Sequence, residues 1–350
     1  KHSNFIHWFD DFIFMSVQQK IDLAIRASGS ISIQDFVEIS NFSKKDGFYN
    51  SEEIQKIGKK GHFITSPEIS SLFGICLTNQ FLSVFPDTKK VHLIEFGPGN
   101  GYLTLDILNY LKSKNIEVQK ISILEKSDYF IKEIKKKIPS AEVFDDLHNI
   151  KINPNITTFF YSNEFFDAFG SKQYIHQNKK FNEIKITKIN NEYKLVYEEN
   201  LISAHLKNRY SNYEFKDKDI LEHSVLIDNL LIKLKEKLKK NFFFSTTDYG
   251  YLKLPRKSTL RLISNHNKIN LFEEFENIDY SFGVNFEYLK DNFKTFKPKV
   301  ISQKELFKKY LNENTYSENK DQVDKTIDML GGSHFENMGD QFLNISFYSV

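Results

Sequence analysis

The sequence is poor in cysteine and has no long apolar run. Cys76 is the only cysteine among the 350 residues, which excludes an intramolecular disulfide and any cysteine-rich metal cluster. No apolar run approaches the roughly 20 residues that a bilayer span requires. A targeting segment is not expected at the N-terminus, because Asp10 and Asp11 interrupt the only apolar stretch that could serve as one. These absences favour a globular protein of a reducing compartment, by default the cytoplasm.

The chain also lacks an excess of charge of either sign. Its 48 lysines and arginines nearly balance 46 aspartates and glutamates, so no bulk field favours nucleic acid or an anionic membrane as a partner. No group of histidine, cysteine and aspartate residues has the spacing of a metal site, and the serine-elbow motif of Ser-His-Asp hydrolases does not occur. A metal is therefore not expected. With 40% hydrophobic residues, the chain can nevertheless bury a sizeable core.

Short apolar runs alternate with helical patterns in the middle of the chain, which is typical of a doubly wound parallel sheet. The alternation predicts an α/β fold with a Rossmann-like sheet. Strands are expected at residues 91–96, 120–126, 141–146 and 241–248, and residues 155–169 are expected to form a strand that runs into a loop. Helices are expected at residues 101–114, 127–138, 226–240 and 323–332.

The first 85 residues have helical periodicity and are predicted to form a helical N-terminal region. Gly29 ends a first helix there, and Ser32 caps a second one. Ser66 followed by Pro67 indicates the start of a long apolar helix that runs to about residue 82.

Within residues 171–240, the first part, residues 171–200, changes to an alternation of period two around the turn pair Asn190 and Asn191. This pattern predicts an inserted antiparallel β meander followed by a helix. Residues 86–170 and 241–350 would then form the core domain, and the last ten residues would add an antiparallel edge strand. An insertion after the fourth strand is expected to cover the ligand crevice at the carboxyl ends of the strands, as a substrate-side cap.

A glycine-rich loop, EFGPGNG, follows the first predicted strand of the sheet. Glu95 stands before Gly97, Gly99 and Gly101, with Pro98 between the first two glycines. A dinucleotide site has the spacing G-x-G-x-x-G, whereas here the third glycine comes one residue early and an acid precedes the first. E-x-G-x-G-x-G is the loop of S-adenosylmethionine-dependent methyltransferases. The glycines would let the backbone approach the methionine and ribose of that cofactor, and Glu95 could hold its ammonium end or a bridging water.

Two further strand ends carry acids at the edge of the sheet where this fold binds ligands. Glu125 ends the second strand, where a carboxylate can accept the two ribose hydroxyls. Asp146 and Leu147 follow the third strand, where adenine would lie. Each acid alone could equally be a solvated strand end. Three acids in register with three strand ends favour a cofactor site.

The chain resembles the MidA family of class I methyltransferases. The resemblance runs from about residue 20 to the C-terminus, and its most specific blocks are FITSPEIS and NEFFDA. It implies a protein arginine N-methyltransferase that acts on a subunit of respiratory NADH dehydrogenase (complex I) or a similar protein, with relatives in the mitochondrial matrix. Three residues depart from the family pattern, which has aspartate at His62, a basic residue at Asn100 and a small residue at Tyr102.

Acidic residues after the fourth strand would face the methyl group, because this fold places that segment beside the methyl donor. Asn163, Glu164 and Asp167 lie in the segment NEFFDAF. A guanidinium is always protonated, so carboxylates must orient it for attack. Glu164 is predicted to be its bidentate acceptor, with Asp167 second. Phe165 and Phe166 could wall the channel or belong to the core.

The block before the sheet would form a lid over the cofactor through Thr65, Ser66 and Glu68. The Ser66 hydroxyl would contact the ligand or cap its helix. The resemblance also places His266 near the substrate entrance, although a structural histidine is an equal alternative.

Other functions stay open at this point. The acceptor could be a small molecule or a nucleic acid, although the balanced charge argues against the latter. A different class of function is a catalytically idle assembly factor that binds a partner protein through the meander. A protein substrate is the expected partner, and a homo-oligomer is compatible with the sequence.

Overall fold

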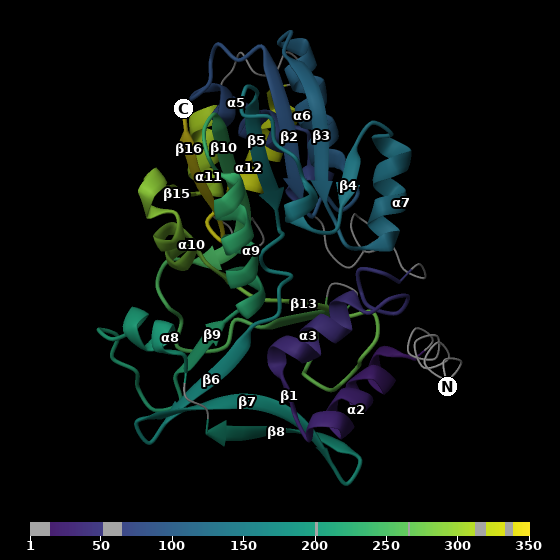
Figure 1. The fold of residues 1–350 in the computed structure, drawn as a ribbon, viewed down its shortest axis with the longest axis vertical. Helices are drawn as coiled ribbons and strands as arrows, with labels where there is room; N and C mark the ends of the chain where they lie inside the picture. The colour runs from purple at the N-terminus through teal and green to yellow at the C-terminus, as the bar shows by residue number, and fades with distance from the viewer. Residues whose placement is uncertain (1–14, 52–64, 200–201, 265–266, 312–319, 333–338) are drawn as a thin grey trace. The chain divides into compact units, whose positions relative to one another are not determined.

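The computed structural model of the chain describes residues 15–51, 65–199, 202–264, 267–311, 320–332 and 339–350 (Figure 1). The chain divides into two compact units. Residues 1–54, 168–228 and 253–283 form the first unit, and residues 55–167, 229–252 and 284–350 form the second.

The second unit contains an eight-stranded sheet with the order β15-β16-β10-β5-β2-β3-β4, and β14 pairs with β10 beside this path. The five strands from β10 to β4 run parallel, which confirms the predicted doubly wound α/β fold. Their bounds are β2 Lys90–Phe96, β3 Glu117–Leu124, β4 Glu142–Phe144, β5 Thr157–Asn163, β10 Phe242–Tyr251, β14 Val284–Asn285, β15 Lys299–Ser302 and β16 Phe342–Ser349.

The C-terminal strand β16 is antiparallel, as predicted, and pairs with β10, but the prediction that it forms the edge was wrong. β15 pairs with its other side and is the outer strand. This strand is only four residues long and begins with an exposed lysine, so it has no apolar run that would identify it in the sequence.

Helices of the second unit connect these strands. Their bounds are α4 Ser66–Ile69, α5 Leu72–Leu82, α6 Tyr102–Ser113, α7 Asp128–Lys137, α10 Phe286–Asn292, α11 Gln303–Tyr310 and α12 Lys320–Gly331, with short 3₁₀ turns at η1 Leu147–Asn149 and η2 Lys294–Phe296. α9, Val225–Lys237, leads into β10.

The long helix predicted over residues 66–82 is interrupted. Ser70 is extended, with φ −162° and ψ 143°, and separates α4 from α5. Its hydroxyl accepts a hydrogen bond from the backbone N–H of Leu72 at 3.2 Å. A serine that bonds the backbone locally competes with helix continuation, which the apolar periodicity did not reveal.

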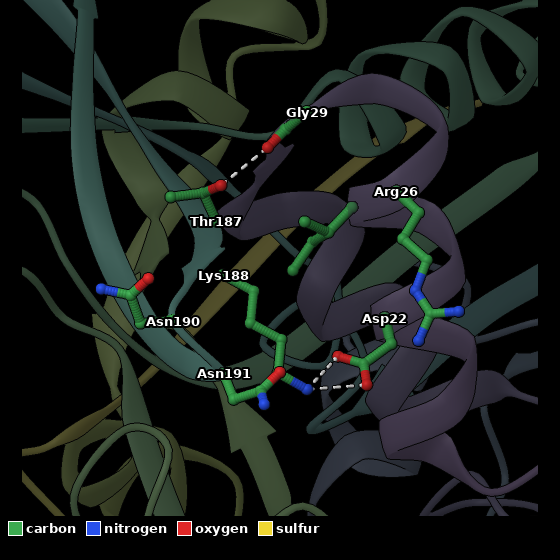
Figure 2. A pocket seen from close by; sticks show the side chains of 8 residues that line it. Asp22, Arg26, Gly29, Thr187, Lys188, Asn190 and Asn191 are labelled. Carbon is green, nitrogen blue, oxygen red and sulfur yellow. Dashed lines mark hydrogen bonds and ion pairs between the residues drawn. The ribbon is translucent and has the colours of Figure 1, made fainter.

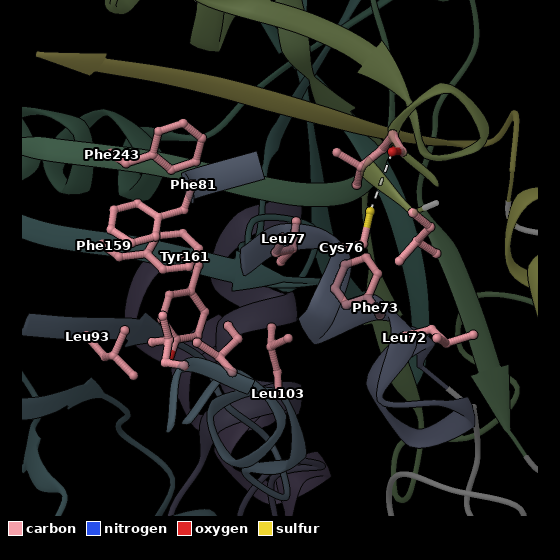
Figure 3. Packing of buried hydrophobic residues seen from close by; sticks show 14 of the residues in the cluster. Leu72, Phe73, Cys76, Leu77, Phe81, Leu93, Leu103, Phe159, Tyr161 and Phe243 are labelled. Atoms are coloured by element: carbon pink, nitrogen blue, oxygen red, sulfur yellow. Dashed lines mark hydrogen bonds between the residues drawn. The ribbon is translucent and has the colours of Figure 1, made fainter. Parts of the chain in front are cut away.

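Aromatic residues from strands and helix meet in the core of the second unit (Figure 3). Phe81 of α5 stacks on Phe159 of β5 with ring centroids 4.8 Å apart. Both rings are fully buried, and burying one such side chain contributes roughly 1.5–3 kcal/mol. Cys76 lies in this core, where burial raises the pKa of its thiol well above the usual value. The thiol is therefore an inert packing group.

The first unit is built on the predicted antiparallel meander. Its five-stranded sheet has the order β1-β7-β6-β9, with β8 on β7, and a smaller sheet has the order β12-β11-β13. The bounds are β1 Ile31–Ser32, β6 Lys172–Gln177, β7 Lys180–Ile189, β8 Glu192–Glu199, β9 Ile220–His223, β11 Arg261–Ser264, β12 Asn267–Lys268 and β13 Asp279–Ser281. The turn between β7 and β8 consists of Asn190 and Asn191, with φ 51° and 64°, as their sequence predicts.

The N-terminal helices α2, Val17–Ser28, and α3, Ile33–Phe42, share this unit, together with the short α8, Ala204–Arg209. Gly29 ends α2 with φ 81°, and Ser32 caps α3 by accepting from the N–H of Asp35, both as predicted. β1 pairs with β7, so the N-terminal segment is part of the meander sheet. Within the described residues, no helix combines the length and the apolar character needed to cross a membrane.

Candidate active site

The glycine-rich loop lies between β2 and α6 and has a left-handed backbone. Gly97, Gly99 and Gly101 have φ 59°, 52° and 76°, a region that residues with a Cβ rarely adopt. The N–H of Gly97 donates to the carbonyl of Leu124 at 3.0 Å, which fixes the start of the loop beside the end of β3. The N–H of Gly101 donates to the carbonyl of Pro98 at 2.9 Å and closes the turn before the helix.

The NEFFDAF segment contacts this loop through an aromatic ring. A Cβ on Gly97 would lie 2.5 Å from Cδ2 of Phe165, so only glycine fits there. The ring of Phe165 also lies 5.7 Å from that of Phe96. Phe166 is buried, with 1% of its surface exposed, and belongs to the core. The structure therefore brings the two motifs singled out in the sequence side by side.

Glu95 ends β2 and is almost fully buried. The Thr104 hydroxyl of α6 donates to its carboxylate, and the Tyr161 hydroxyl of β5 lies 2.6 Å from that of Thr104. Burial raises the pKa of Glu95 to about 8, and the negative charge of Glu125 adds to the shift. A cationic group placed beside Glu95 would favour its ionised form. Thr104 and Tyr161 were not predicted, because no local pattern links them to Glu95.

Glu125 follows β3 and is half-buried. One carboxylate oxygen accepts from the backbone N–H groups of Lys126 and Ser127 at 2.8 and 2.7 Å. Burial raises the pKa of Glu125 to about 7. Since its charge also raises the pKa of Glu95, these two acids act on each other electrostatically, as expected for acids at neighbouring strand ends.

Asp146 lies at the N-cap of η1 and forms an ion pair that the sequence did not predict. One oxygen accepts from the His148 N–H at 2.8 Å, and the other lies 2.6 Å from Nζ of Lys233 on α9. The hydrogen bond from Lys233 lowers the pKa of Asp146. The neighbouring Leu147 is buried, with 1% of its surface exposed. In the structure, the acid predicted to contact adenine is thus paired with a lysine.

The lid residues begin at α4. Thr65 is the N-cap of this helix, so the helix-cap alternative for Ser66 was wrong. Ser66 is fully buried, and its hydroxyl donates to Oε1 of Gln303 at 3.4 Å. Glu68 accepts from the side-chain amide of Asn100 at 2.8 Å and thereby contacts the glycine-rich loop.

The segment after β5 is anchored by a buried acid from β10. The N–H of Glu164 donates to the carbonyl of Thr247 at 2.9 Å, and Glu164 has a left-handed φ of 49°. Asp248 accepts from the N–H groups of Phe165 and Phe166 at 3.0 and 2.8 Å. Asp248 was not among the predicted site residues, although an acid at the end of the predicted strand over residues 241–248 was a usable signal.

Acceptor oxygens without donors gather at the ends of β5 and β10. Within the part of the chain that the structure describes, Oδ1 of Asn163 and Oδ1 of Asp248 are buried and have no hydrogen-bond partner. The amide of Asn163 donates to Glu164 at 2.8 Å. Burial, and then the charge of Glu164, raises the pKa of Asp248 well above its usual range. Asp167 follows in the same segment and is half-buried.

His266 falls outside the residues that the structure describes. A depression of about 530 Å³ in the first unit contains none of the predicted site residues (Figure 2). Nζ of Lys188 lies 3.0 and 2.8 Å from the two carboxylate oxygens of Asp22 there, so these two lining charges neutralise each other.

The strand order, with an antiparallel strand beside β10, and the acid–glycine loop after β2 define the class I methyltransferases. A family model described as "Putative S-adenosyl-L-methionine-dependent methyltransferase" matches residues 76–300. The chain belongs to this family, which confirms the resemblance to MidA. It is an S-adenosylmethionine-dependent methyltransferase.

The chain is also similar to named relatives, and it shares its fold with a solved structure. A Caenorhabditis elegans protein named "Protein arginine methyltransferase NDUFAF7 homolog, mitochondrial" is 24% identical over 297 residues, covering 76% of this chain and 68% of that protein. The human protein arginine methyltransferase NDUFAF7 is 29% identical over 175 residues, which span 41% of this chain and 38% of its own length. A Burkholderia thailandensis protein solved with S-adenosyl-homocysteine has the same fold, with a TM-score of 0.77 at 15% identity over 95% of this chain and 91% of that one.

Proposed function

We propose that the chain methylates an arginine side chain of a protein, with a subunit of respiratory NADH dehydrogenase as the candidate substrate. The observation that carries this proposal is the group of acceptor oxygens on Asn163, Glu164 and Asp248. A guanidinium has five N–H donors and no acceptor, so it complements the unpartnered oxygens of Asn163 and Asp248 beside the Glu164 carboxylate, and its positive charge would favour the ionised form of Asp248. Buried acceptors without donors are costly, and a donor-rich cation would remove that cost.

The glycine-rich loop and its neighbours support the use of S-adenosylmethionine as the methyl donor. The left-handed glycines leave the loop backbone without side chains, and the Phe165 ring packs against it at Gly97. In this proposal the methionine and ribose of the cofactor contact the backbone of the glycine-rich loop at Gly97, Pro98, Gly99 and Gly101. Glu95 and Glu125 accept from the ammonium and the ribose hydroxyls, and the lid residues Thr65, Ser66 and Glu68 close over the cofactor. Asp146 and Leu147 lie beside adenine.

S-adenosylmethionine supplies an activated methyl group. The methyl group would pass to a guanidinium nitrogen with S-adenosylhomocysteine as the leaving group, and the proton that this nitrogen loses would pass to water. Glu164 holds the guanidinium by two charge-assisted hydrogen bonds so that one nitrogen is aligned for in-line attack. Asp167 is the second carboxylate, and Asp248 fixes the segment that carries both.

Names of the relatives support an arginine acceptor, since the similar human and nematode proteins are called protein arginine methyltransferases. The complex I subunit rests on the MidA resemblance. Those relatives are called mitochondrial. For a bacterial-type chain we propose the cytoplasm.

Substitution of Glu164 by glutamine tests the acceptor. Glu164→Gln should abolish methylation, because it removes the charge that binds the guanidinium, and should leave the affinity for S-adenosylmethionine unchanged by calorimetry. The matched control is Glu133→Gln on α7, a surface acid that pairs with Lys136 at 2.6 Å. Unchanged turnover in Glu164→Gln would remove this residue from its role.

Labelling identifies the acceptor directly. The protein is incubated with methyl-labelled S-adenosylmethionine and a lysate from cells that lack it, and the label is located by mass spectrometry. Label on a protein arginine supports the proposal. Label on a metabolite or on RNA would overturn it, and no label in any fraction would favour an assembly factor without activity.

A further inference from the structure

A lysine at the end of α7 contacts the junction between the glycine-rich loop and α6. Nζ of Lys137 donates to the backbone carbonyl of Asn100 at 2.6 Å. The same atom lies 3.3 Å from the ring centroid of Tyr102. Lys137 thus contacts both residues at which the loop departs from the family pattern, one through its backbone and the other through its ring.

The contact is part of a larger arrangement around the loop. A Cβ built on Gly101 would lie 3.8 Å from Cγ1 of Ile134 and 3.7 Å from Cδ1 of Ile138, so the apolar side of the α7 end packs closely there. The side-chain amide of Asn100 donates to Glu68 of α4 at 2.8 Å. Asn100 is therefore held at its side chain by α4 and at its carbonyl by α7.

We infer that Lys137 is a positioning residue for the methyl donor, which sets cofactor affinity by fixing the glycine-rich loop in its binding conformation. Three left-handed glycines give the loop many alternative backbone states, and ordering them on binding reduces affinity. A charged donor on the Asn100 carbonyl and a cation over the Tyr102 ring restrict these states beforehand.

Neighbouring lysines provide matched controls. Lys136 is exposed and pairs with Glu133 at 2.6 Å. Lys135 donates to the carbonyl of Ala141 at 2.5 Å. No contact of either residue with the loop is recorded among the described residues, so Lys136→Met removes the same charge from the same helix turn without disturbing the junction.

The test measures binding of S-adenosylmethionine and S-adenosylhomocysteine to the full chain by calorimetry, which requires no acceptor. Lys137→Met should raise both dissociation constants about tenfold, the loss expected for one charged hydrogen bond. Lys137→Arg should restore most of the affinity, because it keeps a charged donor on the carbonyl. Lys136→Met should bind like the unmodified protein.

A second substitution tests the ring contact by itself, and the melting temperature without ligand distinguishes positioning from folding. Tyr102→Leu should raise the dissociation constants about threefold, since it removes the ring but keeps the carbonyl contact. The inference is overturned by unchanged affinity in Lys137→Met. It is also overturned if affinity and the ligand-free melting temperature fall together and Lys137→Arg rescues neither. The test measures only cofactor binding. Unchanged cofactor affinity in Lys137→Met would therefore not contradict arginine methylation, and a different methyl acceptor would not contradict the role of Lys137.

Discussion

Two neighbouring parts of one sheet, the end of β2 and the ends of β5 and β10, differ in how their polar groups are satisfied. At the end of β2, the carboxylate of Glu95 accepts from Thr104, and the glycine-rich loop is closed by its own backbone bonds. At the ends of β5 and β10, oxygens of Asn163 and Asp248 are buried with no donor among the described residues. The difference suggests a cofactor side that is organised beforehand and an acceptor side that is completed by a cationic substrate.

The largest effect should come from the organised side. Gly97→Val places a Cβ 2.5 Å from the Phe165 ring at a φ of 59°, so clash and backbone strain add. We expect the affinity for S-adenosylmethionine to fall by about 100-fold by calorimetry. Gly29→Ala is the control, because Gly29 has a left-handed φ of 81° in the first unit and nothing within 4 Å of its Cβ position. An equal loss of cofactor affinity in both variants would mean that backbone strain anywhere in the chain causes the effect.

A smaller effect is expected on the acceptor side. Asp248→Asn keeps one acceptor for the Phe165 and Phe166 N–H groups but removes the carboxylate, so turnover should fall about 30-fold with cofactor affinity unchanged. Turnover is followed with methyl-labelled cofactor. Asp279→Asn is the matched control, since Asp279 is also buried, with its pKa raised to about 6, but lies in the first unit. A loss of cofactor affinity in Asp248→Asn would contradict the division into a cofactor side at β2 and an acceptor side at β5 and β10.

The smallest effect concerns pH. Burial raises the pKa of Glu95 from its ordinary value of 4.5 to about 8 in the folded chain, so folding favours its protonated form. Its contribution to stability is therefore present below about pH 4.5 and is lost as the pH rises toward 8. The unfolding free energy of the unmodified protein should decrease between about pH 5 and 8. In Glu95→Gln this decrease should be smaller by on the order of 2 kcal/mol, measured by chemical denaturation. An identical decline in both proteins would mean that the folded chain does not raise this pKa.

The sequence predicted what is local. The glycine-rich loop and its acid form one contiguous motif, and the parallel sheet follows from alternating apolar runs. Asp248 could not be placed in the same way, because its role depends on β10 lying beside β5 in a register that pairs Thr247 with Asn163. Lys137 and Lys233 reach the site from helix positions that look like ordinary solvated lysines in the sequence. The roles of the predicted site residues in binding and transfer stay predictions.

The buried thiol of Cys76 has a practical consequence. Because the only native cysteine is fully buried and its pKa is raised, thiol-specific reagents should leave the folded chain unmodified. A single cysteine introduced at the exposed turn residue Asn190 would then accept one fluorophore at a known position. Its emission would report events at the meander without first removing a native cysteine.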